Sequence, residues 1–172
     1  MSSLTEFYLG QSPDYLGRRL EDIWRWDNDQ LEDCHNYIQV LFPNREPSGV
    51  TPRAPVLDQE TINAFRRDER LRKNLARSLD LMLRFYGLEC DAATGRVERR
   101  DDFEQRAANW IRPLNHNYLR LTRILKCLTD LGLEDRARAL FRCLEEIAAA
   151  RPREIGAAFA YWKEAVECGT VV

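Results

Sequence analysis

Hydrophobic residues recur at helical spacing along most of the chain, most regularly between residues 115 and 132. Steps of three and four positions place one set of side chains on a single side of an α-helix. That set is Tyr118, Leu121, Leu125, Leu128 and Leu131. Ile124 widens the stripe, so we expect a central helix with several neighbours. Asn115 is a suitable N-cap, and Gly132 can adopt the left-handed conformation that ends a helix.

The same spacing predicts six further helical segments, at about residues 12–26, 28–42, 58–86, 102–112, 133–150 and 153–166. Ser12 and Pro13 are expected to start the first of these, because proline is favoured at the first helical position. The apolar phase of the third segment changes near Asp68, which predicts a break there. Two short alternating pieces flank a turn from Asp91 to Gly95 and predict a small β-hairpin.

These segments predict an all-α protein. A chain of 172 residues suits one domain, and mostly short connections favour antiparallel packing. We therefore expect residues 1–172 to form a single compact antiparallel bundle of about seven helices with one small β-hairpin. The exception among the connections is the proline-rich segment 44–57, which is either a strap over the bundle or a functional loop.

Composition narrows the possible locations and partners. The net charge of −2 disfavours binding to nucleic acid through bulk charge. The five cysteines form no CxxC pair, so neither a zinc knuckle nor a dithiol redox site is indicated. The first residues lack the pattern of a secretory signal, and no apolar run approaches the ~20 residues of a membrane span. We expect a reducing, cytoplasmic location and no cofactor.

Two histidine-led runs carry a resemblance to a known family. They are HNYIQVLFP at residues 35–43 and HNYLRLTRILK at residues 116–126. Together with FYLG at 7–10 and FYGL at 85–88, they resemble the conserved N-terminal domain of the opioid growth factor receptor family. The resemblance covers about residues 7–150, and residues 153–166 would add a C-terminal helix.

This resemblance implies an all-helical domain of a family named for binding an opioid peptide. In eukaryotes the family is linked to the nuclear envelope, to membranes and to growth control. The chain lacks the long charged C-terminal extension of animal members and a basic nuclear import cluster. We therefore expect a stand-alone, bacterial member, for which the opioid ligand is a weak guide.

Five residues are candidates for ligand binding. Gln39, Arg120 and Arg123 lie beside the apolar stripes of the two runs, and arginine forks suit a carboxylate. Their other interpretation is ion pairing within the fold. His116 begins the second run, and Trp26 could be an exposed anchor. With only one other histidine and no third ligand indicated, we favour structural roles for the imidazoles and expect no metal site.

The sequence thus favours a non-catalytic domain that binds a peptide or protein with an acidic group or a C-terminal carboxylate. Its binding face would combine Gln39, Arg120, Arg123 and the loop 44–57. One alternative is nucleic-acid binding through the basic run Arg66–Arg77, which Asp68 and Glu69 interrupt. The other is an enzyme whose site is assembled only in three dimensions. The natural ligand and the oligomeric state are left open.

Overall fold

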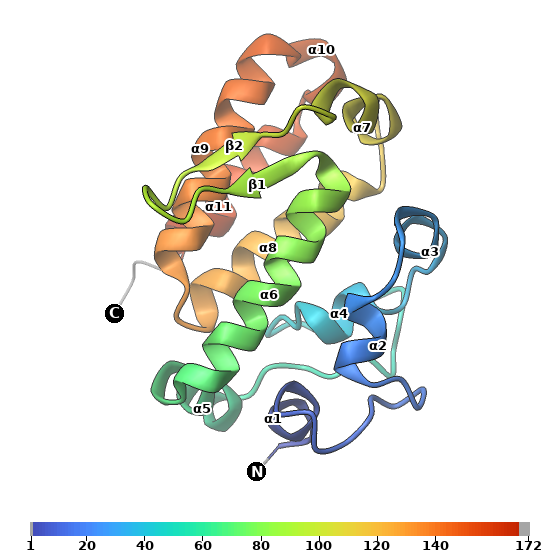
Figure 1. Cartoon of the computed structure of the whole chain (residues 1–172), viewed down its shortest axis with the longest axis vertical. Helices are drawn as coiled ribbons and strands as arrows, with labels where there is room; N and C mark the ends of the chain where they lie inside the picture. Colours follow the sequence, from blue (N-terminus) through green and yellow to red (C-terminus); the bar gives the residue numbers. More distant parts are fainter. Residues whose placement is uncertain (1, 169–172) are drawn as a thin grey trace. The chain divides into compact units, whose positions relative to one another are not determined.

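The computed structural model describes residues 2–168 and consists, over that range, of eleven helices and one two-stranded hairpin (Figure 1). The expected all-α fold with a small β-hairpin is confirmed. The helices outnumber the seven expected because three of the predicted segments each form two helices, and because one further helix, at residues 3–8, was not predicted. The chain divides between Leu79 and Asp80 into two compact units, each described here by itself. None of the helices in this range is long and apolar enough to cross a membrane.

The first unit is organised around a buried tyrosine near its N-terminus. It contains α1 (Ser3–Tyr8), α2 (Leu20–Trp24), α3 (Asn28–Asp33), α4 (Ile38–Leu41), α5 (Gln59–Arg67) and the first part of α6 (Glu69–Tyr86). The hydroxyl of Tyr8 donates a hydrogen bond to the carbonyl oxygen of Leu41 and lies 3.3 Å from the hydroxyl of Ser78. Trp24 donates from Nε1 to the same serine oxygen at 2.9 Å. These bonds satisfy polar groups that burial would otherwise leave unpaired.

The segment expected to be helical over residues 12–26 is helical only from Leu20. A carboxylate oxygen of Asp14 accepts hydrogen bonds from the backbone N–H groups of Leu16 and Arg18, both at 2.9 Å. Such side-chain bonds offer the backbone an alternative to helix. Gly17 completes this turn with a φ of +80°.

Two other expectations for this unit concern residues 28–42 and the break near Asp68. The first segment divides into α3 and α4, because Cys34 is extended at the end of α3. Asp58 caps α5 by accepting from the N–H of Thr61 at 2.7 Å. Asp68 is extended between α5 and α6, as the change of apolar phase predicts.

The second unit is built around the helix that the sequence marks most strongly. It contains the rest of α6, β1 (Leu88–Cys90), β2 (Val97–Arg99), α7 (Phe103–Trp110), α8 (Asn117–Asp130), α9 (Glu134–Ala150), α10 (Pro152–Ile155) and α11 (Ala158–Glu167). The four stripe residues of α8 and the fifth, Leu131, which follows it as C-cap, are all buried. The helix packs against α9 and α11 (Figure 1). The N-cap of α8 is His116 and not the predicted Asn115, although the side chain of Asn115 accepts from the N–H of Asn117 at 2.9 Å. Gly132, two residues after the helix, has a φ of +88°.

Aromatic side chains connect the helices of this unit. The indole of Trp110 donates to the carbonyl oxygen of Tyr86, and that of Trp162 to the carbonyl oxygen of Tyr118, both at 3.1 Å. The rings of Tyr118 and Trp162 meet edge to face with centroids 5.6 Å apart, a favoured geometry for aromatic pairs. The hydroxyl of Tyr118 donates to the carbonyl oxygen of Glu154, as expected of a core tyrosine.

The hairpin follows α6 directly. β1 and β2 pair antiparallel, with Leu88 opposite Arg99 and Cys90 opposite Val97. Gly87 joins α6 to β1 with a φ of +79°. β2 packs on α9, so the hairpin is part of this unit's structure and not only a surface extension.

Candidate functional site

The half-buried indole of Trp26 lies in a surface hollow of about 620 Å³ in the first unit. The hollow is formed by the turn before α2, the end of α2, and α3 with the residues after it. It is lined by Leu16, Arg18, Trp26, Asp27, Asp29, Gln30, Asp33, Cys34 and Asn36. The ring of Tyr37 meets that of Trp26 edge to face at 5.3 Å and fixes its orientation. Leu16 is 49% exposed, so part of the apolar floor is open to solvent.

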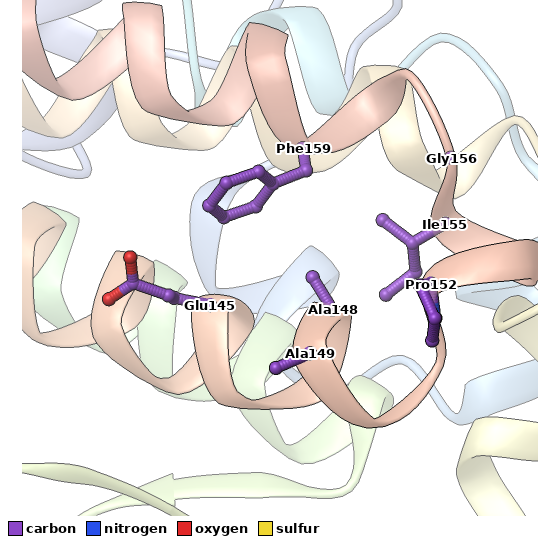
Figure 2. Close-up of a pocket in the computed structure, with 7 residues that line it drawn as sticks. All are labelled: Glu145, Ala148, Ala149, Pro152, Ile155, Gly156 and Phe159. Carbon is purple, nitrogen blue, oxygen red and sulfur yellow. The ribbon is translucent and has the colours of Figure 1, made fainter.

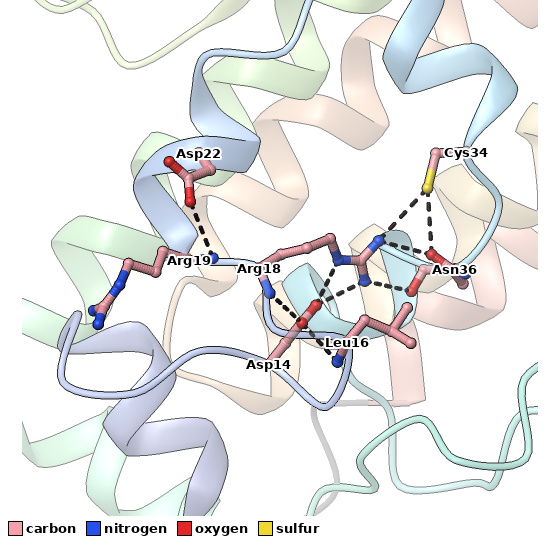
Figure 3. A network of polar contacts seen from close by, with 7 residues as sticks. All are labelled: Asp14, Leu16, Arg18, Arg19, Asp22, Cys34 and Asn36. Carbon is pink, nitrogen blue, oxygen red and sulfur yellow. Dashed lines mark hydrogen bonds and ion pairs between the residues drawn. The ribbon is translucent and has the colours of Figure 1, made fainter.

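Arg18 holds the two walls of this hollow together (Figure 3). Its guanidinium binds the carboxylate of Asp14 through Nε at 2.8 Å and Nη2 at 2.7 Å. It also donates to Asn36, through Nη1 to Oδ1 at 2.7 Å and through Nη2 to the carbonyl oxygen at 3.2 Å. Its carbon Cζ lies 5.7 Å from the centroid of the Trp26 ring. The arginine charge is therefore already neutralised by Asp14.

The rim of the hollow is acidic. Asp27 begins α3 by accepting from the N–H of Gln30 at 2.8 Å, and the Gln30 side chain accepts from the N–H of Asp27 at 3.0 Å. Asp29 and Asp33 lie on the same short helix and are exposed. With Arg18 paired to Asp14, three carboxylates surround the exposed face of Trp26. This arrangement suits an apolar side chain flanked by positive charge.

Sequence reasoning identified Trp26 but not Arg18 or Asp14. The two charged residues are four positions apart, which in a helix would place them on one face, but here they lie in a turn. No local pattern indicates that Arg18 also reaches Asn36, eighteen residues further along the chain. The acidic run of α3 is a sequence signal that could have pointed to the hollow. Leu16 is not, because helical spacing predicts it to face inward, whereas it is 49% exposed in the turn before α2.

Three of the other candidates lie in the second unit, Arg120 and Arg123 on α8 and His116 as its N-cap. His116 is exposed, with Nε2 3.3 Å from Nδ2 of Asn117. Arg120 is only 5% exposed, and its Nη1 donates to Oδ1 of Asn117 at 3.4 Å. Its place beside the stripe suggested that Arg120 faces solvent or a partner, but the side chain is buried. Arg123 is half-buried on the same helix.

The last candidate, Gln39, lies on α4 in the first unit and is 7% exposed. Its Oε1 is buried and accepts no hydrogen bond from the residues described, 2–168. An unsatisfied buried acceptor destabilises a fold by about 1–3 kcal/mol. A binding face shared by Gln39, Arg120, Arg123 and the loop 44–57 stays a prediction.

The loop 44–57 has both buried and exposed positions. Its ends are joined by a hydrogen bond of 3.0 Å from the N–H of Leu57 to the carbonyl oxygen of Asn44. Ala54 and Leu57 are buried, whereas Val50 is 81% exposed. The buried residues are consistent with a strap that packs on its unit. A binding role for the exposed tip stays a prediction.

The basic run Arg66–Arg77 makes contacts within its own unit. Arg70 pairs with Asp68 at 2.9 Å and Lys73 with Glu69 at 3.0 Å, both at exposed positions. Arg77 lies over the ring of Trp24, with Cζ 4.1 Å from its centroid. Such contacts are typical of a solvated helix face whose charges pair with one another, as the interruption by Asp68 and Glu69 predicts. Nucleic-acid binding stays a prediction without support from this geometry.

The second unit has an apolar pocket of about 340 Å³ that sequence reasoning did not identify (Figure 2). Phe159 of α11 and Ile155 of α10 point toward α9, where Ala148 and Ala149 form the opposite wall. Phe159 also stacks on Phe141, with centroids 5.7 Å apart. Gly156 also lines the pocket, between α10 and α11, and its φ of +52° is one that glycine adopts readily.

Between residues 2 and 168 no three histidine, cysteine or acidic side chains are grouped so that they could hold a metal ion. None of the five cysteines forms a disulfide with another. Burial raises the pKa of the Cys127 thiol well above its ordinary value and that of Cys143 to about 11. Both thiols are therefore neutral at pH 7.

Comparison with known proteins gives a consistent result. The family model described as "Opioid growth factor receptor (OGFr) conserved region" matches residues 5–167. The opioid growth factor receptor of Rattus norvegicus is 44% identical over 130 residues, which is 73% of this chain and 22% of that protein. That of Homo sapiens is 41% identical over 156 residues, or 87% of this chain and 23% of that protein.

The opioid growth factor receptor-like protein 1 of Xenopus tropicalis is 36% identical over 135 residues, which is 75% of this chain and 26% of that protein. The chain thus spans about a quarter or less of the length of these curated relatives. No solved structure matches it significantly.

Proposed function

We propose that this chain, which belongs to the opioid growth factor receptor conserved-region family, is a non-catalytic domain that binds a peptide or protein segment. The relatives are named receptors, and this name supports binding over catalysis. The observation that carries the proposal is the hollow around Trp26, where an aromatic ring is presented between an exposed leucine and three carboxylates.

The hollow has the composition of a protein-binding surface. Tryptophan is enriched among the residues that contribute most to binding energy, because a large ring contributes much contact area at low entropy cost. The ring of Trp26 is held in place by Tyr37 and Arg18, so little ordering is needed when a ligand binds. A preformed aromatic floor favours an apolar side chain of the ligand.

The charges of the hollow select the partner. Asp27, Asp29 and Asp33 favour a ligand with lysine or arginine beside its apolar residue. The charge of this ligand is opposite to that of the acidic ligand expected from Arg120 and Arg123. Those arginines belong to the second unit and do not line the hollow, and Arg120 is buried. The proposed ligand of the hollow is a basic, amphipathic segment.

Fluorescence polarisation with labelled synthetic peptides tests this function. One nonapeptide would carry a central leucine flanked by lysines, and a matched one the same leucine flanked by glutamates. We expect the basic peptide to bind more tightly, and Trp26→Ala to weaken its binding at least tenfold, as for a residue worth about 1.4 kcal/mol or more.

The matched control is Tyr161→Ala, which removes an aromatic ring that is 61% exposed in the second unit. Binding unchanged by Trp26→Ala, or reduced equally by Tyr161→Ala, would contradict the assignment of the hollow. Tighter binding of the acidic peptide would contradict the assigned charge of the ligand.

A further inference from the structure

The hairpin and α9 together line a cleft of about 730 Å³ in the second unit. One wall is the turn and start of β2, from Thr94 to Val97, and the other is a face of α9. β2 packs directly on α9, so both walls belong to one packed arrangement. The cleft shares no residue with the hollow around Trp26, and what it binds is independent of the function proposed above.

One face of α9 brings its arginines to this cleft. Arg138, Ala139 and Arg142 line it at steps of one and three residues, and Cys143 follows them. Residues three and four apart on a helix are neighbours on its surface. Two guanidinium groups one turn apart repel each other unless an anion lies between them or near them.

The charges at the cleft are incompletely paired. Arg138 binds Asp135 at 2.8 Å. The guanidinium groups of Arg96 and Arg142 make no hydrogen bond or ion pair with any residue between 2 and 168. Glu146 is the second carboxylate of the lining, so three arginines face two acidic groups. In a chain with a net charge of −2, this cleft is locally positive.

The floor of the cleft is apolar and carries no negative charge. Val97 and Cys143 are 8% and 5% exposed. Burial raises the pKa of the Cys143 thiol to about 11, so it is neutral near pH 7 and does not repel an anion. An organic group could therefore lie against the floor while its charged end reaches the arginines.

We propose that this cleft binds the phosphate group of a small phosphorylated molecule, with Arg96 and Arg142 as its principal ligands. The planar fork of arginine matches the oxygens of a phosphate group and can donate two hydrogen bonds to it. Arg96 comes from the hairpin and Arg142 from α9, so an anion held by both would fasten the hairpin to the helix. The bounded cleft fits a small molecule better than a nucleic-acid strand, which would need an extended basic surface.

Two-dimensional NMR titration of the whole chain tests this inference. The probes are O-phosphoserine, inorganic phosphate and unmodified serine. We expect saturable shifts at the backbone amides of residues 94–97 and 138–143 with the two phosphates and none with serine. A tighter complex with O-phosphoserine than with inorganic phosphate would support the proposal. Equal affinity for the two would overturn it, because the cleft would then bind the free ion and not a phosphorylated molecule.

Arg96→Ala and Arg142→Ala are each expected to weaken phosphate binding about tenfold, the loss typical of one charged hydrogen-bonding partner. The matched control is Arg153→Ala, which removes the same charge from an exposed position of the same unit. Circular dichroism of each variant checks that it folds. No saturable shift up to roughly 10 mM phosphate, which corresponds to negligible affinity, would overturn the proposal. Equal weakening by Arg153→Ala would also overturn it, because it would reduce the effect to bulk charge.

Discussion

Replacing Arg18 by alanine removes the centre of the polar network beside Trp26. The variant loses both guanidinium bonds to Asp14 and both bonds to Asn36. The side chain of Asp14 is only 1% exposed, and that of Arg18 is 17% exposed. The carboxylate of Asp14 would then keep only its hydrogen bonds from the N–H groups of Leu16 and of residue 18, each 2.9 Å in the intact protein.

The expected loss follows from this geometry. Removing one partner of a fully buried ion pair destabilises a protein by about 3–5 kcal/mol, because an uncompensated charge is left behind. The two remaining backbone bonds and water entering the space of Arg18 offset part of that loss. We expect Arg18→Ala to lower the free energy of unfolding by about 2–3 kcal/mol.

The matched control is Arg25→Ala. Arg25 lies 3.7 Å from Asp22, and the two side chains are 78% and 58% exposed. Such exposed pairs contribute about 0–1 kcal/mol. A second comparison adds Asp14→Asn to Arg18→Ala, which removes the orphaned charge but keeps an oxygen that can accept the backbone bonds. The double variant should be more stable than Arg18→Ala alone.

Urea unfolding followed by far-ultraviolet circular dichroism measures the global effect. Hydrogen exchange with mass spectrometry measures the local one, and faster exchange is expected in peptides covering residues 14–36. The reasoning fails if Arg18→Ala is no more destabilising than Arg25→Ala. It fails as well if adding Asp14→Asn recovers no stability, since the buried carboxylate would then not be the cause.

Two further measurements test the second unit. Gly87→Ala should destabilise by about 2–5 kcal/mol in urea unfolding, because a Cβ would lie 2.8 Å from Cα of Phe103 at a φ of +79°; Gly95→Ala, at a φ of +71° with open space around it, should lose only about 1–2 kcal/mol, and equal losses would contradict the contact with Phe103. The folded pKa of Cys143, about 11, exceeds its ordinary value of 9.0, so its contribution to stability is complete below pH 9.0 and is lost as pH rises through about 11. Iodoacetamide should accordingly modify the exposed Cys168 at pH 8 and Cys143 only near pH 11, and rapid modification of Cys143 at pH 8 would show that its thiol is not buried.

The features that local sequence patterns predicted correctly are those decided by neighbouring residues. The stripe of α8, its end at Gly132 and the break at Asp68 follow from helical periodicity and from the preferences of single residues. The hairpin after Gly87 follows from a short alternating pattern around a turn. In each case the relevant contacts join residues close in the chain, so the pattern contains the information.

The late start of α2 and the burial of Arg120 depended on the particular hydrogen bonds that form in the folded chain. Asp14 binds backbone N–H groups that a helix from residue 12 would have used, and Arg18 secures that turn by reaching Asn36. Arg120 could be placed beside the apolar stripe from its spacing, but its exposure depends on how closely the neighbouring helices approach.

Periodicity assigns a residue to a face of its helix, and it does not state what covers that face. Trp26 was a candidate anchor from its position alone, whereas its acidic surroundings and its support by Tyr37 and Arg18 required three separate segments to meet. The cleft lined by Arg96 and Arg142 likewise exists only because the hairpin folds onto α9. Sites of this kind depend on contacts between distant residues, whose geometry no local pattern of hydrophobic and polar positions encodes.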